Sequence, residues 1–250
     1  MLLTLLLIAA IPTTEPSTAP VLHASSFHKT ITKELSLNYL VQLPPRDAEH
    51  PHEKLPLLIF LHGSGECGSD AKALHKVMAN SPMVELPKLP QFRFIVVAPQ
   101  CPSELEWWQV DSLNAMLDDV LAKYDVDPDR VYLTGLSMGG YAVWDWAVHN
   151  PERFAAVAPL SGEPNTDLAE ILAKAKLPIW AFHGAKDKEV WPHEDQKMVA
   201  LIQQQGGDAK LTLYPDVGHG GWSRTYGNPA LYEWFLKHTR REPQPRRATP

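Results

Sequence analysis

The residues with the clearest chemical potential are a serine, an aspartate and a histidine that occur in this order along the chain. Ser137 lies in the segment GLSMG, Asp187 in HGAKDKEV and His219 in DVGHGGW. A serine hydroxyl is a weak nucleophile until a neighbouring base takes its proton. A histidine can be that base, and a carboxylate can hold its tautomer and stabilise the imidazolium. These three residues therefore indicate nucleophilic attack on an acyl group.

The segment around Ser137 has the pattern of a strand, a sharp turn and a helix. An apolar run at residues 131–133 precedes the serine, and a helical apolar pattern follows it. A serine on so sharp a turn, with a positive φ, needs neighbours without Cβ atoms so that the strand and helix backbones can approach. Gly135 and Gly139 meet this need, and a third glycine follows them. The helix N-terminus would also favour a developing negative charge.

The rest of the chain supplies the elements that must position these residues. Short apolar runs, typical of strands buried on both faces, occur at residues 57–61, 94–98, 131–133, 154–160, 179–182 and 211–214. Helical patterns alternate with them at residues 111–124, 137–149, 167–174, 193–205 and 228–237. Residues 35–43 alternate apolar and polar side chains, which indicates an antiparallel edge strand. This order predicts one α/β domain with a mostly parallel sheet.

Asp187 and His219 each come directly after a predicted strand. The carboxyl ends of parallel strands meet at one edge of a sheet, where ligands bind in such folds, so we expect both side chains near Ser137. Two other carboxylates stay open as the acid of the triad, Glu163 and Asp216.

Two further histidines, His62 and His183, each precede a glycine after a predicted strand. The chain has 11 histidines, so most of them must have roles other than catalysis. We interpret His62 and His183 as supports of their loops rather than as the catalytic base.

Cleavage of an ester also requires N–H donors for the tetrahedral oxyanion. The backbone N–H of Met138 directly follows the nucleophile. We expect the second donor in the glycine-rich loop HGSGECG after residues 57–61, with Ser64 as the first choice and Gly65 as the second. The glycine spacing of this loop matches neither of the two common nucleotide-binding motifs, so the sequence does not indicate a bound nucleotide.

Three tryptophans flank these loops, and two interpretations of them stay open. Trp107, Trp108 and Trp222 could form the pocket for the acyl or alcohol group, with Trp108 and Trp222 as the main candidates. Alternatively, they pack where loops cover the sheet, as large apolar side chains commonly do.

Composition excludes several other classes of function. The net charge is −6 and no basic stripe is present, so nucleic acid is not an expected partner. Cys67 and Cys101 are too few for a disulfide framework, although one bridge or two free thiols are both compatible with their positions. Neither cysteine has a partner at metal-ligand spacing, so the sequence predicts no metal site and no cofactor.

The two ends of the chain differ from the middle in composition. Residues 2–11 form an apolar run of signal-peptide length, too short to span a bilayer of ~30 Å, and a Pro/Thr/Ser-rich segment follows. We therefore expect a signal peptide and linker at residues 1–24, a secreted or periplasmic protein and no stable membrane insertion. A catalytic domain is expected at residues 25–240 and a disordered tail at residues 241–250. The sequence indicates no oligomeric state.

The segments LHGSGE, APQCP, GLSMGG, HGAKD and GHGGW resemble the α/β-hydrolase superfamily over roughly residues 30–240. The chain is most similar to a branch of small secreted esterases, described as phospholipase/carboxylesterase-like or as predicted peptidases with a prolyl-oligopeptidase-type catalytic domain. The resemblance implies a mostly parallel, eight-stranded sheet. It also implies a nucleophile, acid and base at Ser137, Asp187 and His219, and oxyanion donors at Ser64 and Met138. Cys67 stands where this branch commonly has an arginine, so the resemblance implies no anion-binding role for this position.

Together these features predict a serine carboxylic-ester hydrolase that forms an acyl-enzyme. Its expected substrate is a small-molecule or polysaccharide-linked ester. A related peptidase is one alternative, but such peptidases usually carry a separate domain that selects peptides, and residues 82–110 are the only longer insertion. A binding protein that has lost catalysis is the other alternative, although a broken triad would be expected for it.

Overall fold

A computed structural model describes residues 26, 28–30, 32–45, 53–105 and 107–240. The chain divides into two compact units, Met1–Glu34 and Leu35–Pro250. The described residues of the first unit have no helix or strand. The predicted signal peptide and the predicted disordered tail both lie outside the described residues.

The second unit contains one sheet with the strand order β1-β3-β2-β4-β5-β6-β7. Only β1 is antiparallel to its neighbour, as the alternation in residues 35–43 predicted. The strands are β1 (Tyr39–Gln42), β2 (Leu55–Leu61), β3 (Ile95–Pro99), β4 (Val126–Leu136), β5 (Ala156–Leu160), β6 (Ile179–Gly184) and β7 (Ala209–Tyr214).

The implied number of eight strands is wrong for the described residues, which form seven. The ladder between β1 and β3 joins only four residue pairs, from Tyr39 with Pro99 to Gln42 with Val96. Residues 32–38 come before β1 and form no strand. Within the described part of the chain, β1 is therefore the edge of the sheet, and no further strand covers it.

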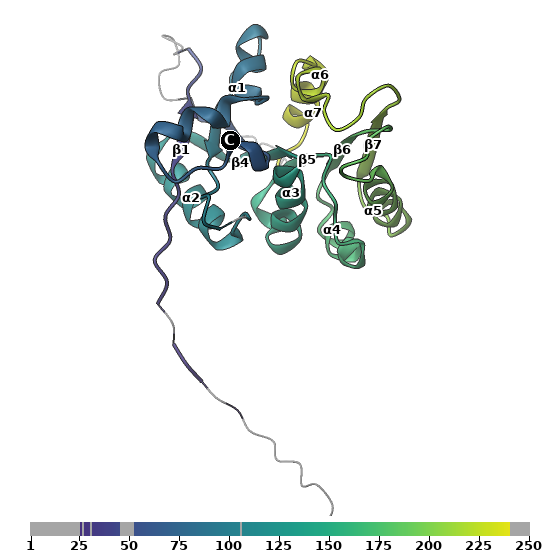
Figure 1. The fold of residues 1–250 in the computed structure, drawn as a ribbon, viewed down its shortest axis with the longest axis horizontal. Coiled ribbons are helices and arrows are strands. Elements are labelled where there is room, and N and C mark those ends of the chain that lie inside the picture. The colour runs from purple at the N-terminus through teal and green to yellow at the C-terminus, as the bar shows by residue number, and fades with distance from the viewer. Residues whose placement is uncertain (1–25, 27, 31, 46–52, 106, 241–250) are drawn as a thin grey trace, which may run out of the picture. The chain divides into compact units, whose positions relative to one another are not determined.

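Helices cover both faces of the sheet (Figure 1). One face carries α2 (Val110–Lys123), α3 (Met138–His149), α4 (Ala169–Ala175) and α5 (Pro192–Gln204). The other face carries α1 (Pro82–Glu85), α6 (Trp222–Tyr226) and α7 (Pro229–Leu236). The five predicted helices are confirmed, with the difference that residues 166–168 form a 3-10 turn before α4.

Strand β2 shows how the sheet separates two apolar layers. Leu57, Ile59 and Leu61 pack with the α2–α5 layer, and Leu58 and Phe60 pack with the opposite layer, because successive side chains of a strand point to opposite faces. All five are fully buried. Burial of one such side chain contributes about 1.5–3 kcal/mol to the stability of the folded protein. The well-packed centre of the sheet can therefore support the loops at its carboxyl edge.

Candidate active site

Ser137 occupies a strained turn between β4 and α3. Its φ of 52° and ψ of −122° lie in a region that residues with a side chain rarely adopt. The N–H of Ser137 donates a hydrogen bond to the carbonyl of Leu160 at 2.9 Å. The neighbouring strand β5 therefore helps to hold the turn, and the predicted positive φ is confirmed.

The glycines around Ser137 allow backbone contacts that no larger residue would permit. A Cβ on Gly139 would lie 2.0 Å from the carbonyl oxygen of Leu61, and a Cβ on Gly135 would lie 2.6 Å from the carbonyl oxygen of Gly139. A Cβ on Gly140 would lie 2.3 Å from the carbonyl oxygen of Leu160. The predicted close approach of strand and helix is confirmed.

The structure brings Ser137, His219 and Asp187 together at the carboxyl edge of the sheet. The Nε2 atom of His219 lies 2.9 Å from Oγ of Ser137. The Nδ1 atom of His219 lies 2.8 Å from Oδ2 of Asp187. Asp187 follows β6 and His219 follows β7, so three separate strand ends supply one hydrogen-bonded line.

The carboxylate of Asp187 is buried and receives several N–H donors. Its Oδ1 atom accepts hydrogen bonds from the backbone N–H of Glu189 at 2.9 Å and of Val190 at 3.0 Å. Burial opposes ionisation, but the N–H of Val190, the ring of His219 and the N–H of Glu189 outweigh it, so the pKa of Asp187 lies below its ordinary value. Asp187 is therefore a carboxylate at neutral pH, as an acceptor for His219 must be.

The two alternative acids are engaged elsewhere. Glu163 accepts a hydrogen bond from the hydroxyl of Tyr141 at 2.8 Å. Asp216 lies on the surface and pairs with Arg224 at 3.1 Å. Of the three candidate carboxylates, Asp187 is the one in contact with His219.

The two candidate oxyanion donors are each the first residue of a helical segment. Met138 begins α3, and Ser64 begins the 3-10 helix Ser64–Glu66. The first N–H groups of a helix have no partner within it and can bind a ligand. The loop that carries Ser64 approaches Ser137, because a Cβ on Gly63 would lie 3.6 Å from the Cβ of Ser137. The oxyanion role of both donors stays a prediction.

His62 is fully buried and ties this loop to the end of β3. Its Nδ1 atom lies 2.6 Å from the carbonyl oxygen of Gly63, and its Nε2 atom accepts the N–H of Cys101 at 3.0 Å. The ring must therefore be neutral, with its proton on Nδ1. Burial lowers the pKa of His62 from 6.5 to about 4. The interpretation of His62 as a loop support agrees with these contacts.

Comparison with known proteins places this geometry in a family. The sequence profile of the Dienelactone hydrolase family matches residues 101–229, more than half of the 250 residues. The chain belongs to the dienelactone hydrolase family. The match includes Ser137, Asp187 and His219, and it ends before most of α7.

Individual relatives of this dienelactone hydrolase family member are distant. A putative carboxymethylenebutenolidase of Yersinia pestis is 25% identical over 140 residues, which are 47% of this chain and 50% of that protein. A bifunctional acetylxylan esterase/xylanase of Neocallimastix patriciarum is 32% identical over 158 residues, 58% of this chain and 23% of that protein. The chain thus spans about half the length, or less, of these curated relatives.

A solved structure of a thermostable esterase has a similar fold. It superposes with a TM-score of 0.70 and 27% identity, and the match covers 81% of this chain and 59% of that chain. The α/β-hydrolase fold of the dienelactone hydrolase family member is therefore established, with the strand count corrected above.

The tryptophans of this family member occupy different environments. Trp108 is only 3% exposed and packs in the core against His62, with ring centroids 4.8 Å apart, which favours the interpretation that it packs beneath a loop over a place in the substrate pocket. The loop after β3 folds it inward, because burying its large apolar ring is favourable. Trp107 is 41% exposed instead and meets the ring of Tyr141 edge-on at 5.5 Å. Trp222 lies beside the site, with its ring 5.3 Å from that of His219.

A cavity of about 220 Å³ lies along α3, with Tyr141, one helical turn after Ser137, as the lining residue nearest to Ser137 in the sequence. Among its lining residues are Trp107, Tyr141, Glu163 and Asn165. Sequence reasoning did not single out Tyr141, although its position one helical turn after Ser137 was a signal that could have found it. The cavity combines aromatic rings with a carboxylate and an amide, and none of Ser137, Asp187 and His219 is among its lining residues.

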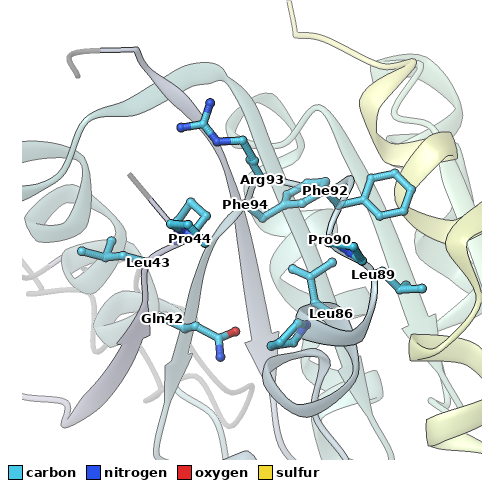
Figure 2. A pocket seen from close by; sticks show the side chains of 11 residues that line it. Gln42, Leu43, Pro44, Leu86, Leu89, Pro90, Phe92, Arg93 and Phe94 are labelled. Carbon is cyan, nitrogen blue, oxygen red and sulfur yellow. The ribbon is translucent and has the colours of Figure 1, made fainter. Parts of the chain in front are cut away.

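A second cavity, of about 390 Å³, lies at the other end of the strands (Figure 2). It is lined by residues from the end of β1 and the start of β3, such as Gln42 and Phe94, and by the segment after α1. The triad residues follow the carboxyl ends of β4, β6 and β7, so this second cavity is separate from them.

Cys67 and Cys101 are free thiols in this structure, and they lie close enough for each to influence the pKa of the other. Burial, followed by the nearby Cys67, raises the pKa of Cys101 to about 12. Both thiols are therefore protonated at neutral pH and are poor nucleophiles. Among the described residues, no cluster of three His, Cys, Asp or Glu side chains could hold a metal ion. No helix in the same part of the chain has the length and apolarity needed to cross a membrane.

The low pKa of His62 predicts a pH-dependent loss of stability. Between pH 6.5 and about 4, the unfolded chain binds a proton at His62 that the folded protein does not bind. The free energy of unfolding should therefore fall as the pH falls through this window, by on the order of 3 kcal/mol in total, and this contribution should be constant above it. Urea unfolding at several pH values measures the effect in the wild type and in His62→Gln.

The His62→Gln variant isolates this contribution, because all other titrating groups are common to both proteins. The gap in unfolding free energy between the two should narrow as the pH falls. A gap that stays constant from pH 7 to pH 4.5 would contradict a neutral, buried His62.

Proposed function

We propose that this protein is a serine hydrolase of carboxylic esters that acts through Ser137, His219 and Asp187. The observation that carries the proposal is the continuous hydrogen-bonded line from Oγ of Ser137 through both nitrogens of His219 to the carboxylate of Asp187, at 2.9 and 2.8 Å. Membership of the dienelactone hydrolase family supports it, as do relatives named as a putative carboxymethylenebutenolidase and a bifunctional acetylxylan esterase/xylanase.

The proposed reaction begins with attack of Oγ of Ser137 on the ester carbonyl. Nε2 of His219 takes the hydroxyl proton, and Asp187 stabilises the imidazolium. The carbonyl oxygen becomes an oxyanion that accepts hydrogen bonds from the N–H groups of Met138 and Ser64. Collapse of this intermediate breaks the ester C–O bond, and His219 returns the proton to the departing alcohol. An acyl-enzyme remains.

Water completes the cycle. His219 removes a proton from a water molecule that attacks the acyl carbonyl, and a second tetrahedral intermediate forms at the same two N–H donors. Its collapse releases the carboxylic acid, and the proton on His219 returns to Oγ of Ser137. Both halves thus use one base and one oxyanion site.

Esters are favoured over peptides as substrates. Residues 82–110 form α1, the 3-10 helix Leu86–Lys88 and β3, and these elements belong to the sheet and one of its covering layers. The described residues of this segment, 82–105 and 107–110, do not form a separate domain that could select peptides. Alkoxide leaving groups also need less protonation than amines do.

The substrate proposed is a small-molecule or polysaccharide-linked ester. The rings of Trp107 and Tyr141 can contact a sugar or phenolic ring, and Glu163 and Asn165 can accept hydrogen bonds from its hydroxyls. A panel of 4-nitrophenyl acetate, acetylated xylan, a feruloyl ester, a lysophospholipid and a prolyl peptide tests this. Turnover of esters without turnover of the peptide is the expected result, and a preference for the peptide would contradict the proposal.

Export of the protein also remains a proposal, because it depends on residues 1–24, which the structure does not describe. N-terminal sequencing of protein secreted into the medium or periplasm tests it. A mature chain that still begins at Met1 inside the cytoplasm would contradict export.

Asp187→Asn should lower kcat by about 10³- to 10⁴-fold, because an amide can donate to His219 and hold the wrong tautomer. Glu163→Gln should lower kcat by less than about tenfold, since the carboxylate of Glu163 bonds to Tyr141 rather than to His219. Steady-state hydrolysis of 4-nitrophenyl acetate measures both. The reverse order of effects would make Glu163 the acid of the triad.

Trp107→Ala should weaken the binding of bulky esters. We expect KM for a feruloyl or sugar ester to rise by about fivefold to tenfold, because an aromatic contact contributes about 1 kcal/mol, while KM for 4-nitrophenyl acetate stays nearly constant. Trp191→Ala is a matched control, since Trp191 is 62% exposed and is not a lining residue of the cavity along α3. Equal effects of the two variants on all substrates would exclude the cavity as a substrate pocket.

A further inference from the structure

A second histidine–aspartate pair lies buried behind Asp187. His183 belongs to β6, and Asp195 lies in the first turn of α5. Both side chains are fully inaccessible to solvent. The Nδ1 atom of His183 lies 2.7 Å from Oδ2 of Asp195. Buried charged groups are costly unless they are paired, so this pair needs a structural or functional explanation.

The neighbours of the His183 ring are all hydrogen-bond acceptors. Nδ1 faces the carboxylate of Asp195, and Nε2 faces the carbonyl oxygen of Val190 at 3.0 Å and Oδ2 of Asp187 at 3.3 Å. A neutral imidazole has only one N–H. The pair must therefore hold two protons, the second either on the ring or on Asp195. In both states Nε2 keeps its N–H.

The charges around the pair agree with this proton count. Burial by itself disfavours a charged ring, but the hydrogen bond and charge of Asp195 outweigh it and raise the pKa of His183. The pKa of Asp195 is raised too, in this case by burial. The hydrogen bond with His183 opposes this rise, as does the Nε1–H that Trp144 donates to Oδ1 of Asp195 at 2.8 Å. Because the pKa values of His183 and Asp195 are both raised, a proton shared between the two side chains is favoured at neutral pH.

The position of Nε2 connects this pair to the triad through two routes. One is direct, because Oδ2 of Asp187 lies near both Nε2 of His183 and Nδ1 of His219. The other is through Val190, whose carbonyl faces His183 while its N–H donates to Oδ1 of Asp187. Each oxygen of Asp187 thus has one neighbour linked to His183, which is the His183 ring for Oδ2 and Val190 for Oδ1.

We propose that the buried His183–Asp195 pair is a positioning unit that orients the Asp187 carboxylate toward His219 through the Nε2–H of His183. This proposal rests on the function proposed above. His183 touches no substrate, so its effect is indirect. Misplacing a catalytic group by about 1 Å can cost about 100-fold in rate, which makes such a unit consequential.

The first test uses the wild-type protein. Long-range ¹H–¹⁵N spectra of the imidazole nitrogens report which nitrogen of His183 carries a proton, and the spectrum of His183→Gln assigns the signals. Nε2 of His183 should be protonated throughout the pH range of activity. A signal typical of an unprotonated Nε2 would overturn the proposal, because the ring would then have no N–H to donate to the carbonyl of Val190 or to face Asp187.

The second test uses kinetics with 4-nitrophenyl acetate. His183→Leu should lower kcat by about tenfold to 100-fold and change KM by less than about threefold, since orientation of the base rather than binding is lost. His149→Leu is the matched control, because His149 forms an exposed pair with Asp145 on α3 and should keep the wild-type kcat. A folded His183→Leu with wild-type kcat would overturn the proposal.

A conservative variant covers the case in which His183→Leu does not fold. In Asp195→Asn, the amide can donate to Nδ1 of His183 and accept from Trp144, so Nε2–H is kept and kcat should stay within about threefold of wild type. Asp195→Leu should lose kcat as His183→Leu does. Equal kcat values for the two Asp195 variants would contradict positioning.

These outcomes are separable from a failure of the proposed function. Hydrolysis that survives Ser137→Ala would refute the proposed function, whereas the protonation of Nε2 of His183 is measured without any turnover. Loss of stability alone, with kcat unchanged, would assign the pair a purely structural role and refute only the positioning proposal.

Discussion

Ser137→Ala abolishes measurable hydrolysis of 4-nitrophenyl acetate, a fall in kcat of about 10⁵- to 10⁶-fold, if Ser137 is the nucleophile. The physical reason is that no acyl-enzyme can form once Oγ is absent, whatever remains of the oxyanion site. Steady-state kinetics and mass spectrometry of the protein with a slowly hydrolysed ester measure the two aspects, turnover and covalent acylation. The wild type should gain the mass of one acyl group, and the variant should gain none.

The matched measurement for Ser137→Ala is His219→Ala, because members of a triad act as a unit and their losses do not add. The double variant should therefore be about as inactive as either single variant. Thermal unfolding should change little for Ser137→Ala, since the loss of one partly exposed hydroxyl removes no core contact. Retained turnover in a folded Ser137→Ala protein would refute the proposed function.

Gly139→Ala should prevent the native fold of the turn rather than only slow the reaction. The added methyl group would lie 2.0 Å from the carbonyl oxygen of Leu61 and 2.7 Å from that of His62, both of which are backbone atoms that cannot move independently. Overpacking a rigid site costs about 1–3 kcal/mol or more, and here the displaced atoms also support Ser137. Denaturant unfolding and circular dichroism should show a large loss of stability or no folded protein.

Gly65→Ala is the stability control for this substitution. A Cβ on Gly65 would meet no other heavy atom of the described structure within 4 Å, so the midpoint of unfolding should change little. If Gly139→Ala were as stable as Gly65→Ala, this result would contradict the close contact between α3 and the end of β2. The comparison tests the backbone geometry independently of catalysis.

Much of the fold follows from local patterns that are visible in the sequence. The apolar runs at residues 57–61 and 179–182 are buried on both faces because they lie in the middle of a covered sheet, and this burial is what makes their composition distinctive. The proximity of Ser137, Asp187 and His219 was predictable for a related reason, since each follows such a run within a few residues. The eighth strand had no such support, because the resemblance alone implied it and no apolar run of the chain called for it.

The orientation of side chains was less accessible to sequence reasoning. Trp107 and Trp108 are adjacent, and only the path of the loop decides that Trp108 points into the core while Trp107 is exposed. In the helix predicted at residues 193–205, Asp195 is an acidic residue of the first turn, which is a common place for such residues. Its contact with His183 depends on how α5 packs against β6, which no local pattern specifies.

Because of the contacts around Ser137, recovery of hydrolysis during refolding should follow the formation of one part of the tertiary structure. Gly139 rests on the carbonyl of Leu61 at the end of β2, and the N–H of Ser137 is held by Leu160 at the end of β5. A chain in which only β4 and α3 have formed lacks both contacts and has nothing to keep Ser137 at a φ of 52°. If the proposed hydrolysis is confirmed, the activity regained during refolding should therefore appear only when β2 and β5 have docked against β4.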